Sequence, residues 1–478
     1  MTLSNTTDFN NTENTSLFEL IALNENLSFI NARDGEQYKL KDLILPLNDI
    51  VCTSKKLVFL YLDSGIKSIL YYLTFLKSSH TIVLLSSSIK QELKENLEKE
   101  YLPYIIFDES RERINDYVFN TLDNDNFKTS FFKNELNNDN SIHNNCKILL
   151  STSGTTGSPK FVKLSEENIL QNALSIASYL PINKDDVAPV NLPLYYSYGL
   201  SVINSNAIAG GKIVCGLPDV LEKDFWKYLD EFKFTSIAGV PFIYEMLKRI
   251  GFLKKSYPSL KYISQAGGNL SENVKSAFYH YCESNAIRFF VMYGQTEATA
   301  RISYVPDNML AKKITSIGIP IKNGKLSIDK ETGELLYSGP NVFGGYANKK
   351  EDLKIWENII TLKTGDLAIQ DEDGFYFIKG RLKRFVKLFG NRVNLDEVES
   401  YLKASLNISL LACNGINDKF ILVSYGIEGL DEAALKKQLF EKYKIHTSVV
   451  KFLYFDSLPI TENGKINYKS IEATYLGK

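Results

Sequence analysis

The stretch STSGTTGSPKFVKLS, residues 151–165, follows directly on an apolar segment, KILL at 147–150. Gly154 and Gly157 allow the backbone to turn several N–H groups toward one point, as in loops that hold phosphate. Hydroxyl and ammonium donors come from Ser151, Thr152, Ser153, Thr155, Thr156 and Lys160. A donor-rich loop at the end of a buried strand therefore predicts a phosphate site.

The loop differs from a Walker A loop, whose pattern is G-x-x-x-x-G-K-[ST]. When Gly154 and Lys160 are aligned with that pattern, Pro159 stands in place of the second glycine. Phe161 stands in place of the Ser or Thr that binds magnesium. The sequence therefore disfavours a P-loop kinase or ATPase and leaves the phosphate chemistry open.

The composition of the chain is that of an ordinary globular protein. It has 478 residues, of which 44% are hydrophobic and 23% charged, and a formal net charge of −1. Without a surplus of basic residues, nucleic acid is not expected as a partner. The polar first residues lack the apolar core of a signal peptide, and the most apolar stretch, from Leu57, is interrupted by Asp63 and Lys67. We expect a cytoplasmic protein without membrane insertion.

The cysteines and histidines give no sign of a zinc site. The five cysteines are scattered, and the four histidines have none of the spacings typical of metal ligands. Reduced, mostly structural thiols are the expectation.

Apolar runs alternate with helical patterns after an arm, residues 1–16, that we expect to be disordered. The segments 56–62 and 80–88 are typical of buried strands, and 65–76 and 89–102 of helices. This alternation predicts parallel α/β layers. The Asn- and Asp-rich segment 121–145 is expected to be a loop. Near residue 380 a smaller, charged unit begins, with Asn394 and Glu397 spaced as a helix capping box.

Four further motifs follow the loop in chain order: YGQTE (293–297), TGDLA (364–368), GRLKRFVKLFGNRV (380–393) and PITENGKI (459–466). With TSGTTGSPK (152–160), they make the chain similar to the adenylate-forming superfamily. That superfamily includes acyl-CoA synthetases, adenylation domains of peptide synthetases and luciferases. The resemblance spans residues 151–466, and no motif in residues 1–145 matches.

The resemblance implies an α/β fold with two domains. A large N-terminal domain, residues 17–381, would combine α/β layers with a β-barrel-like part. A small, mobile α+β domain, residues 384–478, would carry the catalytic lysine. The hinge between them would lie at 382–383, with Lys383 as the hinge residue.

The implied reaction is attack of a carboxylate on the α-phosphate of ATP, with release of pyrophosphate. Two anions must approach each other, so the site needs cations and N–H donors. The quoted loop would hold the β- and γ-phosphates. The residues that the resemblance assigns to the nucleotide are Thr152, Ser153, Gly154, Thr155, Thr156, Gly157, Lys160, Gly267, Gly268, Tyr293, Gly294, Asp366, Arg381 and Arg392.

Particular roles also follow from the resemblance. Tyr293 would stack on the adenine, and Asp366 would accept hydrogen bonds from both ribose hydroxyls, with Arg381 contacting the ribose or a phosphate. Thr296 would contact the α-phosphate. Magnesium would be held by Glu297 and Thr156, since this hard cation prefers oxygen ligands.

Lys465 would be the central catalytic residue, together with Thr296 and Glu297. It would bridge the substrate carboxylate and the α-phosphate and so reduce their repulsion. Rotation of the small domain about Lys383 would then exchange Lys465 for the face GNRVNLDEVE (390–399) and admit a thiol for the second half-reaction.

The segment PLYYSYGLSV (193–202) bears on the substrate. Tyr196, with Tyr195 and Tyr198, would shape a partly polar pocket beside Gly267. Aligned with the F-D-x-S-V segment of amino-acid-activating domains, the segment has Gly199 where they have the aspartate that anchors an α-ammonium. The alignment favours a carboxylic acid without an α-amine.

The predicted function is an ATP-dependent acid–thiol ligase that uses Mg²⁺ and passes the acyl group to the phosphopantetheine thiol of CoA or of an acyl carrier protein. A weaker resemblance suggests a role in bacterial surface-glycan modification. An amino-acid–carrier ligase of the D-alanine-activating type, a non-catalytic nucleotide-binding protein and a luciferase-like oxygenase stay open as alternatives.

Overall fold

A computed structural model describes residues 15–47, 54–135, 141–151, 160–382, 384–388, 391–406, 408, 410–417, 419–461 and 465–477. The predicted disordered arm lies outside the described residues except at its last two positions. Ser16 Oγ accepts a hydrogen bond from the backbone N–H of Glu19 at 3.1 Å and caps helix α1 (Leu17–Ala22). Ordered chain thus begins within the predicted arm.

The first large sheet has eight strands, and four neighbouring members run parallel. In spatial order they are β19 (Tyr346–Ala347), β9 (Phe161–Leu164), β8 (Ile148–Ser151), β4 (Thr81–Ser86), β3 (Leu57–Leu62), β5 (Ile105–Phe107), β7 (Lys128–Lys133) and β6 (Val118–Asp123). Every residue of β3 and β4 is buried, as expected for parallel strands covered on both faces. Helices α2 (Ile66–Lys77) and α3 (Gln91–Tyr101) follow these two strands, which confirms the predicted alternation.

The prediction of a loop over 121–145 is wrong for its first part. Strands β6 and β7 form an antiparallel hairpin, and Oδ1 of Asn124 accepts the backbone N–H of Phe127 at 2.7 Å in its turn. The buried side chains of Leu122 and Phe131 tie the hairpin to the main core. The many Asn and Asp residues hid this alternation, although they are also the residues that favour tight turns.

Two further sheets complete the α/β layers of the chain. One contains β12 (Ser236–Gly239), β13 (Tyr262–Gln265), β14 (Arg288–Tyr293), β15 (Ser303–Val305) and β16 (Ile319–Pro320). The other contains β10 (Val187–Pro189), β11 (Lys212–Cys215), β1 (Ser28–Asn31) and β2 (Gln37–Tyr38). Their helices are α4 (Glu166–Tyr179), α5 (Ser197–Ala209), α6 (Lys223–Phe232), α7 (Pro241–Arg249) and α8 (Glu272–Ser284).

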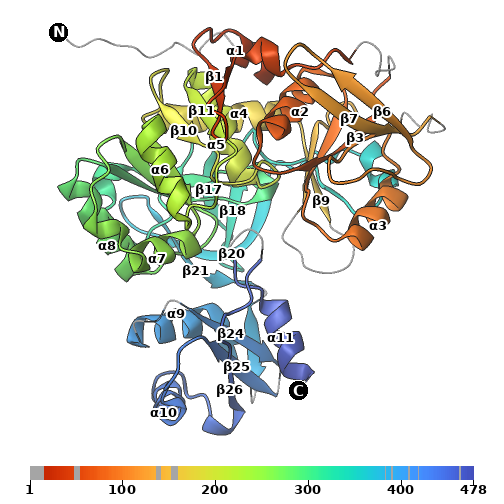
Figure 1. Ribbon diagram of the computed structural model, residues 1–478. Helices are drawn as coiled ribbons and strands as arrows, with labels where there is room; N and C mark the ends of the chain where they lie inside the picture. The colour runs from red at the N-terminus through yellow and green to blue at the C-terminus, as the bar shows by residue number, and fades with distance from the viewer. Residues whose placement is uncertain are drawn as a thin grey trace.

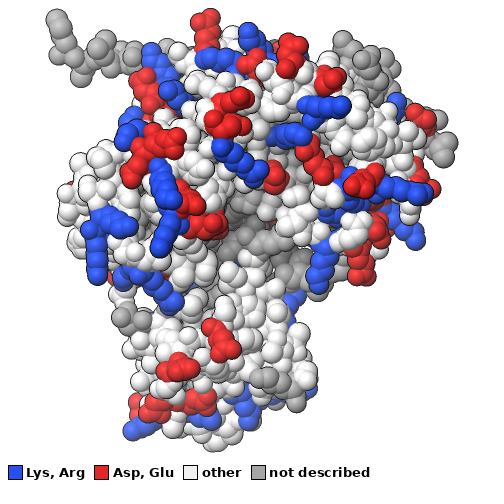
Figure 2. Space-filling view, viewed as in Figure 1, with Lys and Arg blue, Asp and Glu red and all other residues white. Residues whose placement is uncertain are grey.

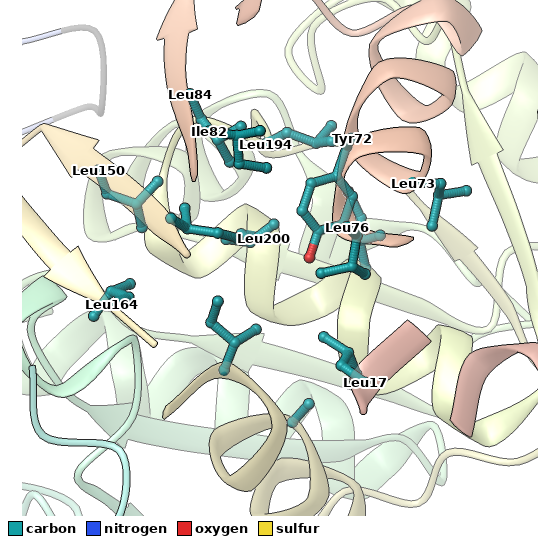
Figure 3. Close-up of a cluster of buried hydrophobic side chains, with 14 of the residues drawn as sticks. Leu17, Tyr72, Leu73, Leu76, Ile82, Leu84, Leu150, Leu164, Leu194 and Leu200 are labelled. Carbon is teal, nitrogen blue, oxygen red and sulfur yellow. The ribbon is translucent and has the colours of Figure 1, made fainter. Parts of the chain in front are cut away.

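The main core lies between these layers. Figure 3 shows leucines of α2, β4, β8, β9 and α5 pointing toward one another, among them Leu76, Leu84 and Leu200. Burying each such side chain contributes about 1.5–3 kcal/mol relative to leaving it exposed. The buried hydroxyl of Tyr72 is satisfied inside this core, because it donates a hydrogen bond to Oδ1 of Asn204 at 2.8 Å. Helices α2 and α5 are thereby fixed against each other.

A small antiparallel sheet ends the large part of the molecule, which we define as residues 15–382. It consists of β17 (Lys325–Ile328), β18 (Glu334–Ser338), β20 (Leu362–Gln370) and β21 (Tyr376–Arg381). Asp366 and Arg381 are cross-strand partners in it. Figure 1 shows β20 and β21 directly above the remaining, C-terminal unit.

The small part, residues 384–477, is an α+β unit with its own core. Its elements are β22 (Phe385–Leu388), β23 (Asn391–Asn394), α9 (Leu395–Leu406), β24 (Leu411–Ile416), β25 (Phe420–Tyr425), α10 (Glu432–Tyr443), β26 (Val450–Tyr454) and α11 (Tyr468–Leu476). Its buried hydrophobic residues form clusters of their own. Asn394 caps α9 as predicted, since its Oδ1 accepts the backbone N–H of Asp396 at 2.9 Å. The predicted domain boundary and rotation about it remain predictions.

Charge on the visible surface is mixed. Figure 2 shows basic and acidic side chains beside one another over the described surface of the large part, in agreement with the near-zero net charge. Among the helices described, none has both the length and the apolar character needed to cross a bilayer.

Candidate active site

The loop quoted first connects two neighbouring antiparallel strands. Ser151, at the end of β8, pairs with Phe161, at the start of β9. A Walker A loop instead joins a strand to a helix, so the local fold agrees with the mismatches to that motif. The predicted residues Thr152, Ser153, Gly154, Thr155, Thr156 and Gly157 lie outside the described residues, as does the predicted hinge residue Lys383. The side chain of Arg392 is likewise not described, and these assignments stay predictions.

The chain turns sharply after β14, at the YGQTE motif. A Cβ atom at Gly294 would lie 1.9 Å from the carbonyl oxygen of Ala300, so only glycine fits there. The short 3-10 helix Thr296–Ala298 follows, and Oγ1 of Thr296 lies 3.3 Å from Oγ of Ser197 at the start of α5. The predicted phosphate-contacting residue therefore touches the helix that carries the predicted acid pocket.

Asp366 is a buried carboxylate with two partners from the predicted nucleotide site. Tyr293 donates its hydroxyl proton to Oδ2, and Nε of Arg381 donates to Oδ1 at 3.2 Å. Burial raises the pKa of Asp366, and the positive charge of Arg381 opposes that rise. The structure thus brings together three residues that the sequence assigned to one ligand, in a form able to accept hydroxyl hydrogen bonds.

Tyr346 links Glu297 to the end of the predicted phosphate loop. Its hydroxyl donates to Oε1 of Glu297 at 2.8 Å, and Nζ of Lys160 lies 3.2 Å from its ring centroid. Tyr346 is on β19, which pairs with β9 directly after the loop. The sequence analysis missed this residue, because pairing between strands so far apart in the chain leaves no local signal.

Lys465 reaches the large part from near the C-terminus. Its Nζ lies 5.9 Å from the ring centroid of Tyr196, and its backbone N–H donates to Oγ1 of Thr461 at 3.2 Å. Burial and the charge of Arg381 lower the pKa of Lys465, whereas Glu297 and Asp366 act to raise it. The lysine is therefore within electrostatic reach of both carboxylates.

Gly267 has the backbone freedom that its position demands. Its φ angle is +86°, and a Cβ atom there would lie 2.4 Å from the hydroxyl oxygen of Tyr196. The neighbouring Gly268 accepts a hydrogen bond from Nε2 of Gln265 at 2.9 Å through its carbonyl oxygen. The glycine turn thus borders Tyr196, and with it the position of Lys465.

Gly199 has a different environment from the one its alignment suggested. A Cβ atom there would lie 2.2 Å from the carbonyl oxygen of Pro193 and 2.7 Å from that of Leu192. The position faces the chain's own backbone, which is sufficient reason for a glycine. Its assignment to the acid pocket stays a prediction, and the missing carboxylate alone does not decide between amino acids and other acids.

The described residues could bind magnesium only together with the phosphates of a bound nucleotide. In the described part of the chain, no group of three or more His, Cys, Asp or Glu side chains could hold a metal ion. Magnesium, however, is commonly bound by one or two carboxylates together with substrate phosphates. Glu297, beside the end of the phosphate loop, meets that requirement.

A family model described as "AMP-binding enzyme" matches residues 47–347. Since this is more than half of the chain, the protein belongs to the AMP-binding enzyme family. Curated relatives include an oxalate–CoA ligase of Arabidopsis thaliana, 26% identical over 69% of this chain and 68% of the relative. A 2-succinylbenzoate–CoA ligase of Enterococcus faecalis is 28% identical over 66% of this chain and 67% of its own.

Solved structures share the whole fold. An o-succinylbenzoate CoA synthetase of Bacillus subtilis, in complex with its acyl-adenylate, has a TM-score of 0.76 at 19% identity and covers 96% of this chain and 98% of its own. An anthranilate CoA ligase in complex with anthranoyl-AMP has a TM-score of 0.75 at 17% identity, covering 97% and 98%. The predicted superfamily, fold class and enzyme class, an AMP-forming ligase, are confirmed.

Proposed function

We propose that this enzyme activates a carboxylic acid with ATP and then transfers the acyl group to the thiol of CoA. The observation that carries the proposal is the position of Lys465, beside Tyr196 and within electrostatic reach of Glu297 and Asp366. Its Nζ can contact a reacting carboxylate and an α-phosphate at the same time. The names of the relatives, which are CoA ligases, favour CoA as the acceptor.

In the first half-reaction a carboxylate oxygen bonds to the α-phosphorus of ATP, and the bond to the β-phosphate oxygen breaks. Acyl-AMP and pyrophosphate are the products. Lys465 reduces the repulsion between the two anions. In other enzymes, removing a group that stabilises transition-state charge raises the activation free energy by about 3–4 kcal/mol. Thr296 holds the α-phosphate from the other side, where Ser197 fixes its hydroxyl.

The nucleotide is held by groups on three segments. Asp366 accepts hydrogen bonds from the ribose hydroxyls, and Tyr293 stacks on the adenine. Arg381 contacts the ribose or a phosphate. Residues 152–157 and Lys160 hold the β- and γ-phosphates, and Glu297 with Thr156 binds Mg²⁺. When bound, Mg²⁺ neutralises part of the phosphate charge.

In the second half-reaction the thiol sulfur attacks the acyl carbonyl, and AMP leaves. The small part rotates about Lys383 so that Lys465 withdraws and the face 390–399, which includes Arg392, approaches. A carrier-protein thiol belongs to the proposal as the alternative to CoA, and surface-glycan modification belongs to it as a use of the acyl group. The cytoplasmic location is also part of it and rests on the sequence.

The test is acid-dependent release of pyrophosphate from ATP, with hydroxylamine present to trap acyl-adenylate. The acids span short, hydroxy, dicarboxylic, long-chain, aromatic and amino acids, and Lys465→Ala is measured beside Lys451→Ala, an exposed lysine of β26. We expect release with at least one acid, lost in Lys465→Ala and kept in Lys451→Ala. Replacing hydroxylamine with CoA or a phosphopantetheinylated carrier protein identifies the acceptor. Equal release by Lys465→Ala would contradict the mechanism.

A further inference from the structure

The loop between β14 and β15, which carries the YGQTE motif, contains a strained residue. Thr299 has a φ angle of +63° and a ψ angle of −57°, a region that a β-branched residue seldom adopts. The backbone N–H of Ala300 donates to the carbonyl oxygen of Ala298 at 2.7 Å and closes a γ-turn centred on Thr299. Such a conformation is costly and persists only where neighbouring groups enforce it.

Asn341 holds this turn from outside the loop. The residue is buried, with 1% of its surface exposed. Its Nδ2 donates to the carbonyl oxygens of Ala298 and Arg301, at 2.8 Å in each case. Oγ1 of Thr299 donates in return to the backbone carbonyl oxygen of Asn341 at 2.8 Å. Three hydrogen bonds thus join one asparagine to the strained residue and to both sides of it.

The contacts of Asn341 leave its amide one orientation. Carbonyl oxygens can only accept hydrogen bonds, so the two N–H groups of Nδ2 must face them. Oδ1 accepts the hydroxyl proton of Tyr337 at 2.7 Å, and Tyr337 lies on β18 in the main core. Both polar atoms of the side chain therefore have partners, and losing the Nδ2 donor would remove one partner from each of two buried carbonyl groups.

Asn341 is itself fixed by helix α4. Nδ2 of Asn168 donates to the carbonyl oxygens of Pro340 and Val342, at 2.7 and 3.0 Å. Asn168 lies in the first turn of α4, where its backbone N–H donates to Oγ of the cap residue Ser165 at 3.0 Å. The two chain neighbours of Asn341 are thus tied to a helix that begins directly after β9.

The clamped turn directly follows Thr296 and Glu297, the residues predicted to contact the α-phosphate and Mg²⁺. The backbone N–H of Phe343, two residues after Asn341, donates to the carbonyl oxygen of Glu297 at 3.0 Å. The same segment carries Tyr346, whose hydroxyl donates to the carboxylate of Glu297. The position of Glu297 therefore depends on contacts at its backbone, at its side chain and at the turn that follows it.

We propose that Asn341 is a positioning residue for adenylation: it holds the strained turn so that Thr296 and Glu297 keep the geometry that the α-phosphate and Mg²⁺ require. The inference rests on the proposed function, since it concerns how that site is built. A misplacement of about 1 Å can lower a reaction rate by about 10²-fold, so a clamp on these two residues bears on kcat.

The first test is Asn341→Asp, which keeps the size of the side chain and replaces the Nδ2 donor by an oxygen that repels both carbonyl oxygens. Pyrophosphate release with hydroxylamine present gives kcat and KM for the acid that the wild type uses best. Titration calorimetry gives the gain in ATP affinity on addition of Mg²⁺. We expect kcat to fall about 10–100-fold, KM for the acid to stay within about twofold, and the gain from Mg²⁺ to shrink.

Asn24→Asp is the matched control. Nδ2 of Asn24 donates to the carbonyl oxygens of Leu20 on α1, at 3.2 Å, and of Ile208 on α5, at 3.0 Å. It thereby joins two helices by the same kind of contact, at the opposite end of α5 from Ser197. Thermal unfolding is recorded for both variants. Both should lose stability, and only Asn341→Asp should change kcat and the gain from Mg²⁺ at a temperature at which both are folded.

Thr299 provides a second, independent pair of variants. Thr299→Val keeps the branched side chain and removes the hydroxyl that donates to Asn341, whereas Thr299→Ser keeps this hydroxyl. We expect kcat to fall several-fold in Thr299→Val and to stay near the wild-type value in Thr299→Ser. If Asn341→Asp does not fold, this pair decides.

The outcomes separate the two proposals. If no acid of any class supports pyrophosphate release by the wild type, the proposed function fails. If the wild type is active but folded Asn341→Asp keeps its kcat and its gain from Mg²⁺, or if Asn24→Asp lowers kcat as much, the ligase stands and the role of Asn341 is overturned. Equal kcat values in Thr299→Val and Thr299→Ser would overturn it as well.

Discussion

The two ends of the candidate site differ in how their charges are met. At the nucleotide end, Asp366 has Tyr293 and Arg381 as partners, and Glu297 has Tyr346. At the predicted acid end, the ring centroid of Tyr196 lies 5.9 Å from Nζ of Lys465, and its hydroxyl borders the turn at Gly267. Charged partners hold the predicted nucleotide end, whereas an aromatic ring and a glycine turn border the predicted acid end.

The largest expected effect is that of Lys465→Ala, which removes the cation between the two ends. We expect kcat for acid-dependent pyrophosphate release to fall about 10²–10³-fold, the usual loss for a group that stabilises transition-state charge. ATP binding, measured by titration calorimetry, should stay close to that of the Lys451→Ala control. Parallel loss of ATP binding would assign Lys465 to the nucleotide end instead.

Asp366→Ala should impair the nucleotide end selectively. Two hydroxyl hydrogen bonds to a charged acceptor are lost, each contributing about 1.5–3 kcal/mol, so KM for ATP should rise about 100-fold or more. KM for the acid should change little. Glu372→Ala, an exposed carboxylate in the same β20–β21 hairpin, is the control. Equal effects on the two KM values would erase the distinction between the ends.

Gly267→Ala tests the approach of the glycine turn to Tyr196. The positive φ angle and the contact at 2.4 Å should together cost about 1–3 kcal/mol of unfolding free energy, measured by urea denaturation. Adding Tyr196→Phe removes the oxygen in that contact and should recover part of the loss. If the double variant is no more stable than Gly267→Ala, the contact does not limit this position.

Tyr346→Phe keeps the ring beside Lys160 and removes the hydrogen bond to Glu297. A single hydrogen bond to a charged group contributes about 1.5–3 kcal/mol, and solvent at this half-buried site replaces part of it. We therefore expect a several-fold higher Mg²⁺ concentration for half-maximal pyrophosphate release, with ATP affinity in the absence of Mg²⁺ unchanged. An unchanged Mg²⁺ dependence would remove Tyr346 from the metal site.

The smallest effect concerns pH. Because burial and Arg381 lower the pKa of Lys465, this ammonium loses its proton at lower pH than an exposed lysine does. Adenylation should therefore decline on the alkaline side as pH passes through this lowered pKa. Lys465→Arg, if active, should extend activity to higher pH, since arginine keeps its charge. An alkaline limb that is identical in both enzymes would come from another group.

What the sequence could predict depended on whether the information was local. Buried runs such as 57–62 determine their strands directly, and five contiguous motifs indicated the nucleotide end. Tyr346 reaches the site through pairing between distant segments, so spacing gave no sign of it. Gly199 suggested a substrate preference from alignment, yet close backbone packing explains it. The β6–β7 hairpin was missed because turn-forming residues outnumbered its buried ones.

The most direct test of the whole account is exchange of labelled pyrophosphate into ATP, which reports reversible adenylation alone. The wild-type enzyme, Lys465→Ala and Lys451→Ala are each measured with no acid and with the acid that best supports pyrophosphate release. The account predicts acid-dependent exchange in the wild type and in Lys451→Ala, and loss of exchange in Lys465→Ala. Exchange that needs no acid, or that persists in Lys465→Ala, would contradict it.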